Sequence, residues 1–309
     1  MAKKHPAIKP LIFVFTVLLS VFLLWIGASI GIYNFYFGRR FESNPALLNH
    51  VYDFDGLERT RYEFESDKGQ TLVGYMYAAG GEQKAIIVFA HGYGGGGHNS
   101  YMKIINYFAQ NGFYVFAYDA TGNDESGGKG IGGVPQGLID LNYSISFVEE
   151  SGYFPDLPIC LFGHSWGGYS ACNVLVYHPE VNAVVECSGP CSSTDLLEGG
   201  GKNVVGPMIY ILLPVIKTYE KAKFGEYAEC NALNGFAATD APVMVVHSSD
   251  DNIVPISYGY DIYYEHYKDD PRFVFRRLEG KGHNLFLDVD RNTELFESVV
   301  DFYNKNLSN

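Results

Sequence analysis

The sequence has few cysteines and lacks several motifs that bind metals or nucleotides. Five cysteines occur among 309 residues, and no two of them are spaced as C-x-x-C. A disulfide scaffold needs a higher density of cysteines, and a paired zinc motif needs that spacing. The absence of a G-K-[ST] triplet excludes a phosphate-binding P-loop. The sequence also has no cluster of His, Cys and carboxylate residues that would indicate a catalytic metal, so we expect neither a metal nor a cofactor.

Basic residues are also in short supply. After position 40 the chain holds 17 basic and 35 acidic residues, which gives residues 41–309 a net charge of −18. Such an acidic surface repels phosphate groups, which argues against nucleic acid and anionic lipid surfaces as partners. A composition of 47% hydrophobic and 18% charged residues excludes a disordered chain and predicts a sizeable core. These counts leave the oligomeric state open.

One long segment has no charge at all. Residues 10–38 contain no Asp, Glu, Lys, Arg or His, and about 20 apolar residues suffice to cross the hydrocarbon core of a bilayer. A cleaved signal peptide is the competing interpretation, but its apolar region is only about 7–15 residues long and ends at a small-residue cleavage site. Neither feature fits well here. We therefore expect a short basic tail over residues 1–10 and a single transmembrane helix over residues 11–38.

The basic residues that flank this segment predict its orientation. Lys3, Lys4, Lys9 and the terminal amine precede it, whereas Arg39 and Arg40 follow it. The positive-inside rule places the more basic side in the cytoplasm. We therefore expect a single-pass protein of the cell membrane whose larger part is extracytoplasmic.

After a juxtamembrane linker over residues 39–60, extended and helical patterns alternate. Residues 61–66 and 70–77 read as a hairpin. The later apolar runs lack polar alternation, as do strands buried on both faces of a parallel sheet; they cover residues 84–90, 113–119, 157–163, 181–188, 241–248 and 272–279. Helix-like segments lie between them, at residues 101–111, 136–150, 167–177, 257–267 and 293–304. This order predicts an α/β fold over residues 61–309, with a mostly parallel eight-stranded sheet and helices on both faces.

Residues 190–240 interrupt this alternation. The segment is too long for an ordinary connection between two strands, and it contains the apolar, helix-like stretch GPMIYILLPVIKTYEKAKFG. We expect it to form a small helical cap inserted into the fold. Cys191 and Cys230 both fall in this cap and could pair, a question that the sequence leaves open.

A nucleophile motif stands where one strand is expected to end and a helix to begin. Gly163-His164-Ser165-Trp166-Gly167 has the form G-x-S-x-G. The glycines allow a turn so sharp that the serine hydroxyl stands clear of the sheet. Because the motif lies between a buried strand and a helix, we take Ser165 as the candidate nucleophile.

A serine hydroxyl needs a neighbouring base, and the base needs an acid that orients it. On an elbow of this kind the three residues follow in the order Ser, acid, His. Asp250 and Asp251 follow one expected strand and His283 follows the next, in loops where α/β proteins build their sites. His266 is the only other histidine after Asp251, but it lies in a helical pattern away from that edge.

At these residues the chain resembles the α/β-hydrolase superfamily, over nearly all of residues 61–309. The likeness is greatest to membrane-anchored bacterial serine hydrolases of the esterase, lipase and serine-aminopeptidase-like branch. The family acid follows a strand in an H-G-x-x-D-x-x-V-P pattern, which aligns with Asp251 and has Ser248 at the usual glycine, so Asp250 remains an alternative. The family histidine aligns with His283. The resemblance implies an α/β-hydrolase fold and a Ser165–His283–Asp251 triad.

Such a site also needs two backbone N–H groups that stabilise an oxyanion. The residue after the nucleophile, Trp166, supplies one. The loop His91-Gly92-Tyr93 resembles the H-G-x motif of the family, which makes the N–H of Tyr93 the second, with His91 shaping the loop. Residues 119–126 resemble a further family motif in which Thr121 and Asp124 replace the usual Arg and Gly, and we expect this stretch to be structural.

The glycine loop permits a different interpretation. Gly92, Gly94 and Gly97 have the G-x-G-x-x-G spacing of a dinucleotide-binding loop, and Asp119 follows at a suitable distance. Four consecutive glycines satisfy that spacing almost automatically, however. A dinucleotide site would also leave Ser165, Asp251 and His283 unexplained.

The expected function is therefore hydrolysis of an acyl bond, most simply a carboxylic ester, with a small acyl compound as substrate. A peptidase of the same fold is the alternative. It would need a charged group to hold a substrate terminus, and the cap offers Glu198, Glu226 and Glu229 without a recognisable motif. A membrane-tethered binding protein on a hydrolase scaffold is a third possibility, but such scaffolds usually lose a triad member.

Overall fold

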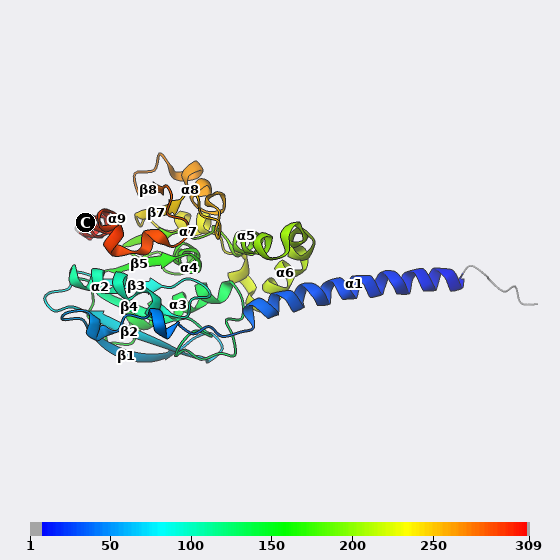
Figure 1. Cartoon of the computed structure of the whole chain (residues 1–309), viewed down its shortest axis with the longest axis horizontal. Coiled ribbons are helices and arrows are strands. Elements are labelled where there is room, and N and C mark those ends of the chain that lie inside the picture. Colours follow the sequence, from blue (N-terminus) through cyan, green and yellow to red (C-terminus); the bar gives the residue numbers. More distant parts are fainter. Residues whose placement is uncertain (1–7, 308–309) are drawn as a thin grey trace, which may run out of the picture.

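A computed structural model describes residues 8–307 of the chain and contains one eight-stranded sheet (Figure 1). The sheet order is β1-β2-β4-β3-β5-β6-β7-β8, with β2 antiparallel to β1 and β4 and every other pair parallel. This confirms the expected α/β-hydrolase fold. The strands are β1 (Glu58–Glu65), β2 (Thr71–Ala78), β3 (Ile86–Ala90), β4 (Tyr114–Asp119), β5 (Ile159–His164), β6 (Ala183–Cys187), β7 (Val243–Ser248) and β8 (Phe273–Leu278).

The central strands lack polar alternation because both faces of the sheet are covered. Every residue of β3, β5, β6 and β7 is buried. Along β3, Ile86 and Val88 belong to the hydrophobic core on one face, whereas Ile87 and Phe89 belong to the core on the other. Burying apolar area on both sides favours this arrangement by about 25 cal/mol for each Å² removed from water.

Helices pack against both faces of the sheet and complete the two hydrophobic cores. Phe108 of α2 and Tyr303 of α9 pack in one core, while Leu138 of α3, Ala171 of α4 and Tyr263 of α8 pack in the other. The bounds are α2 (Met102–Gln110), α3 (Pro135–Glu150), α4 (Trp166–Asn173), α8 (Tyr260–Tyr267) and α9 (Thr293–Asn306).

The segment between β6 and β7 is mostly helical. It forms α5 (Ser193–Val205), α6 (Ile209–Phe224) and α7 (Ala232–Ala238), and Gly206 separates the first two at a φ of 59°. Cys191 is buried and Cys230 half-buried, and both are free thiols.

Helix α1 (Ile8–Phe37) is long and apolar enough to cross a membrane, and its two ends differ in their surroundings. Every residue from Pro10 to Leu24 is exposed. From Trp25 onward the helix packs against the cap, so that Tyr33 is 1% exposed. Figure 1 shows α1 running out past α5 and α6, away from the sheet.

Candidate active site

Ser165 occupies a strained turn between β5 and α4. Its φ is 57° and its ψ −115°, in a region that residues with a side chain rarely adopt. The flanking glycines are required by close packing: a Cβ on Gly163 would lie 2.2 Å from the carbonyl oxygen of Gly167, and one on Gly167 would lie 2.0 Å from that of Ala90. The Ser165 N–H donates to Cys187 O on β6 at 2.8 Å. The turn is therefore set by the glycines and the backbone, with the hydroxyl left to project.

The loops after β5, β7 and β8 bring the three expected side chains together. Ser165 Oγ lies 2.9 Å from His283 Nε2, and His283 Nδ1 lies 2.6 Å from Asp251 Oδ2. All three residues are buried. This arrangement lets Nδ1 donate to the carboxylate and leaves Nε2 to accept from the serine hydroxyl, so the imidazole can take the serine proton.

The two neighbouring aspartates lie in different positions. Asp251 Oδ1 accepts from the N–H groups of Ile253 and Val254 at 2.9 and 3.0 Å, which leaves Oδ2 for His283. Asp250 is exposed, and its carboxylate accepts from Ser248 Oγ and from two backbone N–H groups of the loop before His283. Asp250 thus braces the histidine loop, while Asp251 contacts the histidine.

Hydrogen bonds keep the Asp251 carboxylate ionised. Burial would raise its pKa, but hydrogen bonds from His247 and His283 outweigh burial and hold the pKa well below its usual range. An ionised acid at this place stabilises the imidazolium that forms when His283 takes a proton.

Two further histidines support the site, and the sequence analysis missed both. His247 lies near the end of β7, and its Nε2 lies 2.9 Å from Val254 O and 3.3 Å from Asp251 Oδ2, the same carboxylate oxygen that His283 contacts. His164 Nε2 donates to the backbone oxygen of His283 at 3.1 Å, and its Nδ1 accepts from Tyr101 OH. The sequence offered one signal for each of them: His164 directly precedes Ser165, and His247 lies in the strand before Asp251.

The two expected oxyanion donors flank the nucleophile. Trp166 begins α4, directly after Ser165, and Tyr93 lies in the loop after β3. Within residues 8–307, neither backbone N–H takes part in another hydrogen bond. Buried His91 shapes this loop: its Nε2 accepts from Ala120 N–H, and its Nδ1 donates to Gly92 O. Burial lowers the pKa of His91, which keeps it neutral.

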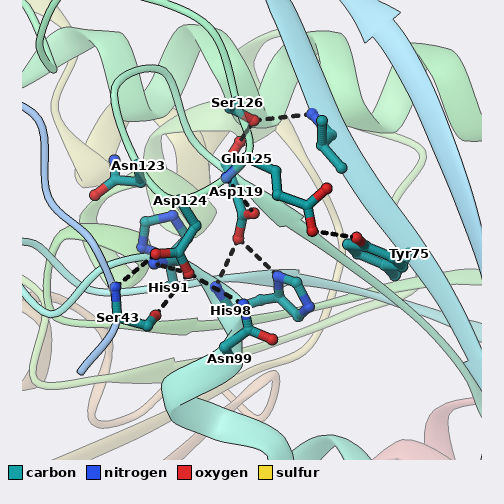
Figure 2. A network of polar contacts seen from close by, with 12 residues as sticks. Ser43, Tyr75, His91, His98, Asn99, Asp119, Asn123, Asp124, Glu125 and Ser126 are labelled. Carbon is teal, nitrogen blue, oxygen red and sulfur yellow. Dashed lines mark hydrogen bonds and ion pairs between the residues drawn. The ribbon is translucent and has the colours of Figure 1, made fainter. Parts of the chain in front are cut away.

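The loop after β4 is a polar network (Figure 2). Asp119 is fully buried and accepts from the backbone N–H and the Nδ1 of His98. The Asp124 carboxylate accepts from Ser43, Gly97 and Asn99. A Cβ on Gly97 would lie 1.8 Å from Asp119 Oδ1. The glycine loop is therefore packed against the chain's own carboxylates, which leaves no room beside Gly97 for a dinucleotide phosphate.

A cavity of about 910 Å³ extends from the nucleophile. Ser165, His283 and Tyr93 are among its lining residues. Apolar side chains of α1 and the cap line much of the rest, among them Ile32, Tyr36, Leu197, Val204, Ile209 and Ile216. None of Glu198, Glu226 and Glu229 is among its lining residues in the part of the chain described.

One group of possible metal ligands lies apart from this cavity. Glu149, His178 and Glu180 place their ligand atoms within 4.8 Å of one another, near the ends of α3 and the start of β6. The other ring nitrogen of His178, Nε2, lies 2.9 Å from Asn142 Oδ1. None of these three possible metal ligands is among the described residues that line the cavity.

The chain is similar in sequence to known proteins. A family described as serine aminopeptidase, S33, matches residues 81–223, which include the Tyr93 loop and Ser165. The uncharacterized protein YqkD of Bacillus subtilis is 26% identical over 78% of this chain and 78% of its own. The acylamino-acid-releasing enzyme of Rattus norvegicus is 22% identical over 71% of this chain, which spans only 31% of that enzyme.

Solved structures share the fold. The esterase Pf2001 of Pyrococcus furiosus superposes with a TM-score of 0.67 at 19% identity, covering 87% of this chain and 98% of its own. The acylaminoacyl peptidase of Pyrococcus horikoshii gives a TM-score of 0.63 at 16% identity, over 82% of this chain and 42% of its own. These matches support an α/β serine hydrolase of either the esterase or the aminopeptidase-like kind. The chain has the α/β-hydrolase fold and is similar in sequence to serine hydrolases of that fold.

Proposed function

We propose that the protein is a membrane-anchored serine hydrolase that cleaves carboxylic ester bonds. The observation that carries this proposal is the chain of contacts from Ser165 to His283 to Asp251 beside an apolar cavity. Each group has the neighbour that its role in acyl transfer requires.

The reaction follows from these contacts. Ser165 Oγ attacks the ester carbonyl as His283 Nε2 takes the hydroxyl proton, and the N–H groups of Tyr93 and Trp166 stabilise the oxyanion. Collapse breaks the ester C–O bond, and His283 returns the proton to the departing alcohol. Water then attacks the acyl-enzyme with His283 again as base, which releases the acid and restores Ser165. Asp251 stays ionised and stabilises each imidazolium.

The cavity wall favours an ester over a peptide. Its apolar lining suits an acyl chain, and two of the cap glutamates that could hold a peptide terminus are engaged elsewhere. Glu198 contacts Lys202 and Tyr258, and Glu229 contacts Lys221.

A peptidase is the second candidate, because two residues that carry carboxylates, Asp195 and Asp288, line the cavity. Asp195, in the first turn of α5, lines it and is half-buried. A carboxylate in that place could hold the ammonium group of a peptide, as an aminopeptidase requires. The named family and the acylaminoacyl peptidase relatives add weight to this candidate.

Turnover by the full-length protein in detergent distinguishes the two. We expect p-nitrophenyl esters to be hydrolysed and aminoacyl anilides to be poor substrates. Faster hydrolysis of the anilides than of the esters would favour the peptidase. In that case Asp195→Asn should lower the rate of anilide hydrolysis. The full chain is needed because α1 contributes Ile32, Tyr33 and Tyr36 to the cavity wall.

The anchor and its orientation belong to the same proposal. Helix α1 would span the membrane with Lys3, Lys4 and Lys9 on the cytoplasmic side and the catalytic part outside. A protease added to cells without their wall should degrade the catalytic part and spare a tag placed before Lys3. Protection of the catalytic part, under conditions that cleave a known surface protein, would reverse the orientation.

A further inference from the structure

The freely exposed part of α1 is too short to cross a bilayer by itself. Residues 10–24 are exposed, and at 1.5 Å per residue they cover about 22 Å. The hydrocarbon core is about 30 Å thick. A span that begins at Pro10, just after Lys9, must therefore continue to about Ile30, which places Trp25 about 7 Å inside the hydrocarbon.

The cap contacts α1 at this depth. Trp25 Nε1 donates to Ile211 O of α6 at 2.9 Å. Farther along α1, Tyr33 OH donates to Glu220 Oε1 at 2.6 Å. Two bonds at different heights fix α6 alongside α1, so the start of α6 lies level with the part of α1 that must be in the membrane.

The adjoining surface of the cap is apolar. We call residues 204–211, which join α5 to α6, the cap tip. Val204, Met208, Tyr210 and Ile211 are each half or more exposed, between 50% and 61%. From 203 to 216 the sequence has no charged residue, and lysines stand at both ends of this run. An uncharged run of about 10–14 residues is too short to span a bilayer but suits a segment that lies in its interface.

The catalytic cavity reaches the same surface. Val204 of the cap tip is half-exposed and also lines the cavity, together with Ile209 and with Tyr36 of α1. Ser165 and His283 line the same cavity. Its volume of about 910 Å³ stands near the upper end of the range of about 300–1,000 Å³ for small-molecule sites.

We propose that the cap tip inserts into the bilayer beside α1, and that the cavity draws its substrate from the membrane as an uncharged lipid ester, an acylglycerol. This inference rests on the proposed serine hydrolase and names its substrate class. The ester C–O bond of the lipid breaks, the acyl group passes to Ser165 Oγ, and His283 returns the proton to the glycerol oxygen. Water then releases the fatty acid. The charge of −18 on residues 41–309 disfavours anionic lipids, which makes an uncharged head group the better fit.

Activity on two substrates tests the proposal in the full-length protein. In Met208→Asp/Ile211→Asp, neither of which lines the cavity, we expect hydrolysis of a long-chain diacylglycerol in phosphatidylcholine vesicles to fall at least about tenfold, because carboxylates oppose insertion. Hydrolysis of p-nitrophenyl acetate should stay within about twofold. The matched control is Tyr153→Asp/Val176→Asp, which alters apolar side chains that are also exposed. These residues lie in the connections that precede β5 and β6, at the amino ends of these strands, whereas Ser165 follows the carboxyl end of β5. The control variant should preserve both activities.

The outcomes separate this inference from the proposed function. Unchanged lipid hydrolysis in the cap-tip variant, or a wild-type protein that cleaves p-nitrophenyl acetate but no acylglycerol, overturns the lipid proposal alone. A wild-type protein that cleaves neither substrate overturns the hydrolase itself.

A second measurement needs no activity. In a Cys230→Ser background, an environment-sensitive fluorophore on Met208→Cys should be quenched by phospholipids brominated on their acyl chains, whereas one on Tyr153→Cys should not. Equal quenching of the two positions would contradict insertion of the cap tip.

Discussion

The loops around Ser165 and the seam between α1 and the cap both join distant parts of the chain, but they do so by different means. Around the nucleophile, short hydrogen bonds fix each group from several sides: Asp251 alone accepts from His283, Ile253 and Val254. Along the seam, a few hydrogen bonds lie far apart among aromatic contacts. The first region positions atoms, whereas the second positions helices and shapes the cavity.

Changes at the first region should therefore abolish the chemistry without disturbing the fold. Ser165→Ala removes the nucleophile but keeps the glycines that set the turn, so we expect kcat to fall by about 10⁴–10⁶. The melting temperature should change little. Measurement of p-nitrophenyl ester turnover checks this, and a variant that keeps more than a few per cent of wild-type turnover would contradict the assignment.

Substitution of the two neighbouring aspartates tests whether catalysis needs a carboxylate in contact with His283 or only a negative charge nearby. Asp251→Asn should lower kcat by about 10⁴, because the amide cannot hold His283 in the required tautomer. Asp250→Asn is the control and should cost less than tenfold, since Asp250 touches only the loop backbone and Ser248. The reverse order of effects in steady-state kinetics would exchange their roles.

Buried His164 should make the first region sensitive to acid. Burial, and secondly the neighbouring His283, lower the pKa of His164 to about 3, whereas an unfolded chain titrates near 6.5. Between these pH values the unfolded state binds more protons than the folded state. The folded state is therefore favoured by neutral His164 in full above about pH 6.5, and this contribution to the unfolding free energy is lost as the pH falls toward 3. His164→Gln should flatten the dependence of the unfolding free energy on pH. Denaturant titrations at pH 5 and pH 7.5 measure this dependence. An equal change in unfolding free energy between the two pH values in variant and wild type would show that His164 is not its cause.

The seam should contribute stability with little effect on chemistry. Tyr33→Phe deprives buried Glu220 of one partner and should lower the unfolding free energy by about 1–2 kcal/mol. Tyr219→Phe, which loses a longer and exposed bond to Asn34, should cost less than about 0.5 kcal/mol. Tyr219→Phe, which lies outside the cavity lining, should hydrolyse p-nitrophenyl acetate within about twofold of wild type. A large drop in kcat for Tyr33→Phe alone would show that the two regions are coupled.

The same contrast explains what the sequence could predict. The central strands β3, β5, β6 and β7 were located to within a few residues because burial on both faces leaves continuous apolar runs. The G-x-S-x-G motif was found because it is local in the sequence. The choice between Asp250 and Asp251 rested on family resemblance, because adjacent residues differ only in where the folded loop points them.

The contacts of α1 with the cap had no comparable signal. Trp25 and Ile211 are 186 residues apart, and nothing local marks either as a partner of the other. His247 was missed for a similar reason, because a histidine at the end of a buried strand reveals its neighbour only after β7 and its loop have folded. The sequence analysis therefore identified candidate catalytic residues but not the cavity that they line.

The central claim is that Ser165 is the activated nucleophile, and covalent labelling tests it most directly. A fluorophosphonate probe, applied to the full-length protein in detergent and followed by peptide mass spectrometry, should modify the peptide that contains Ser165. Prior Ser165→Ala substitution should remove the label. An unlabelled wild-type protein, or a label that persists in Ser165→Ala, would contradict the account.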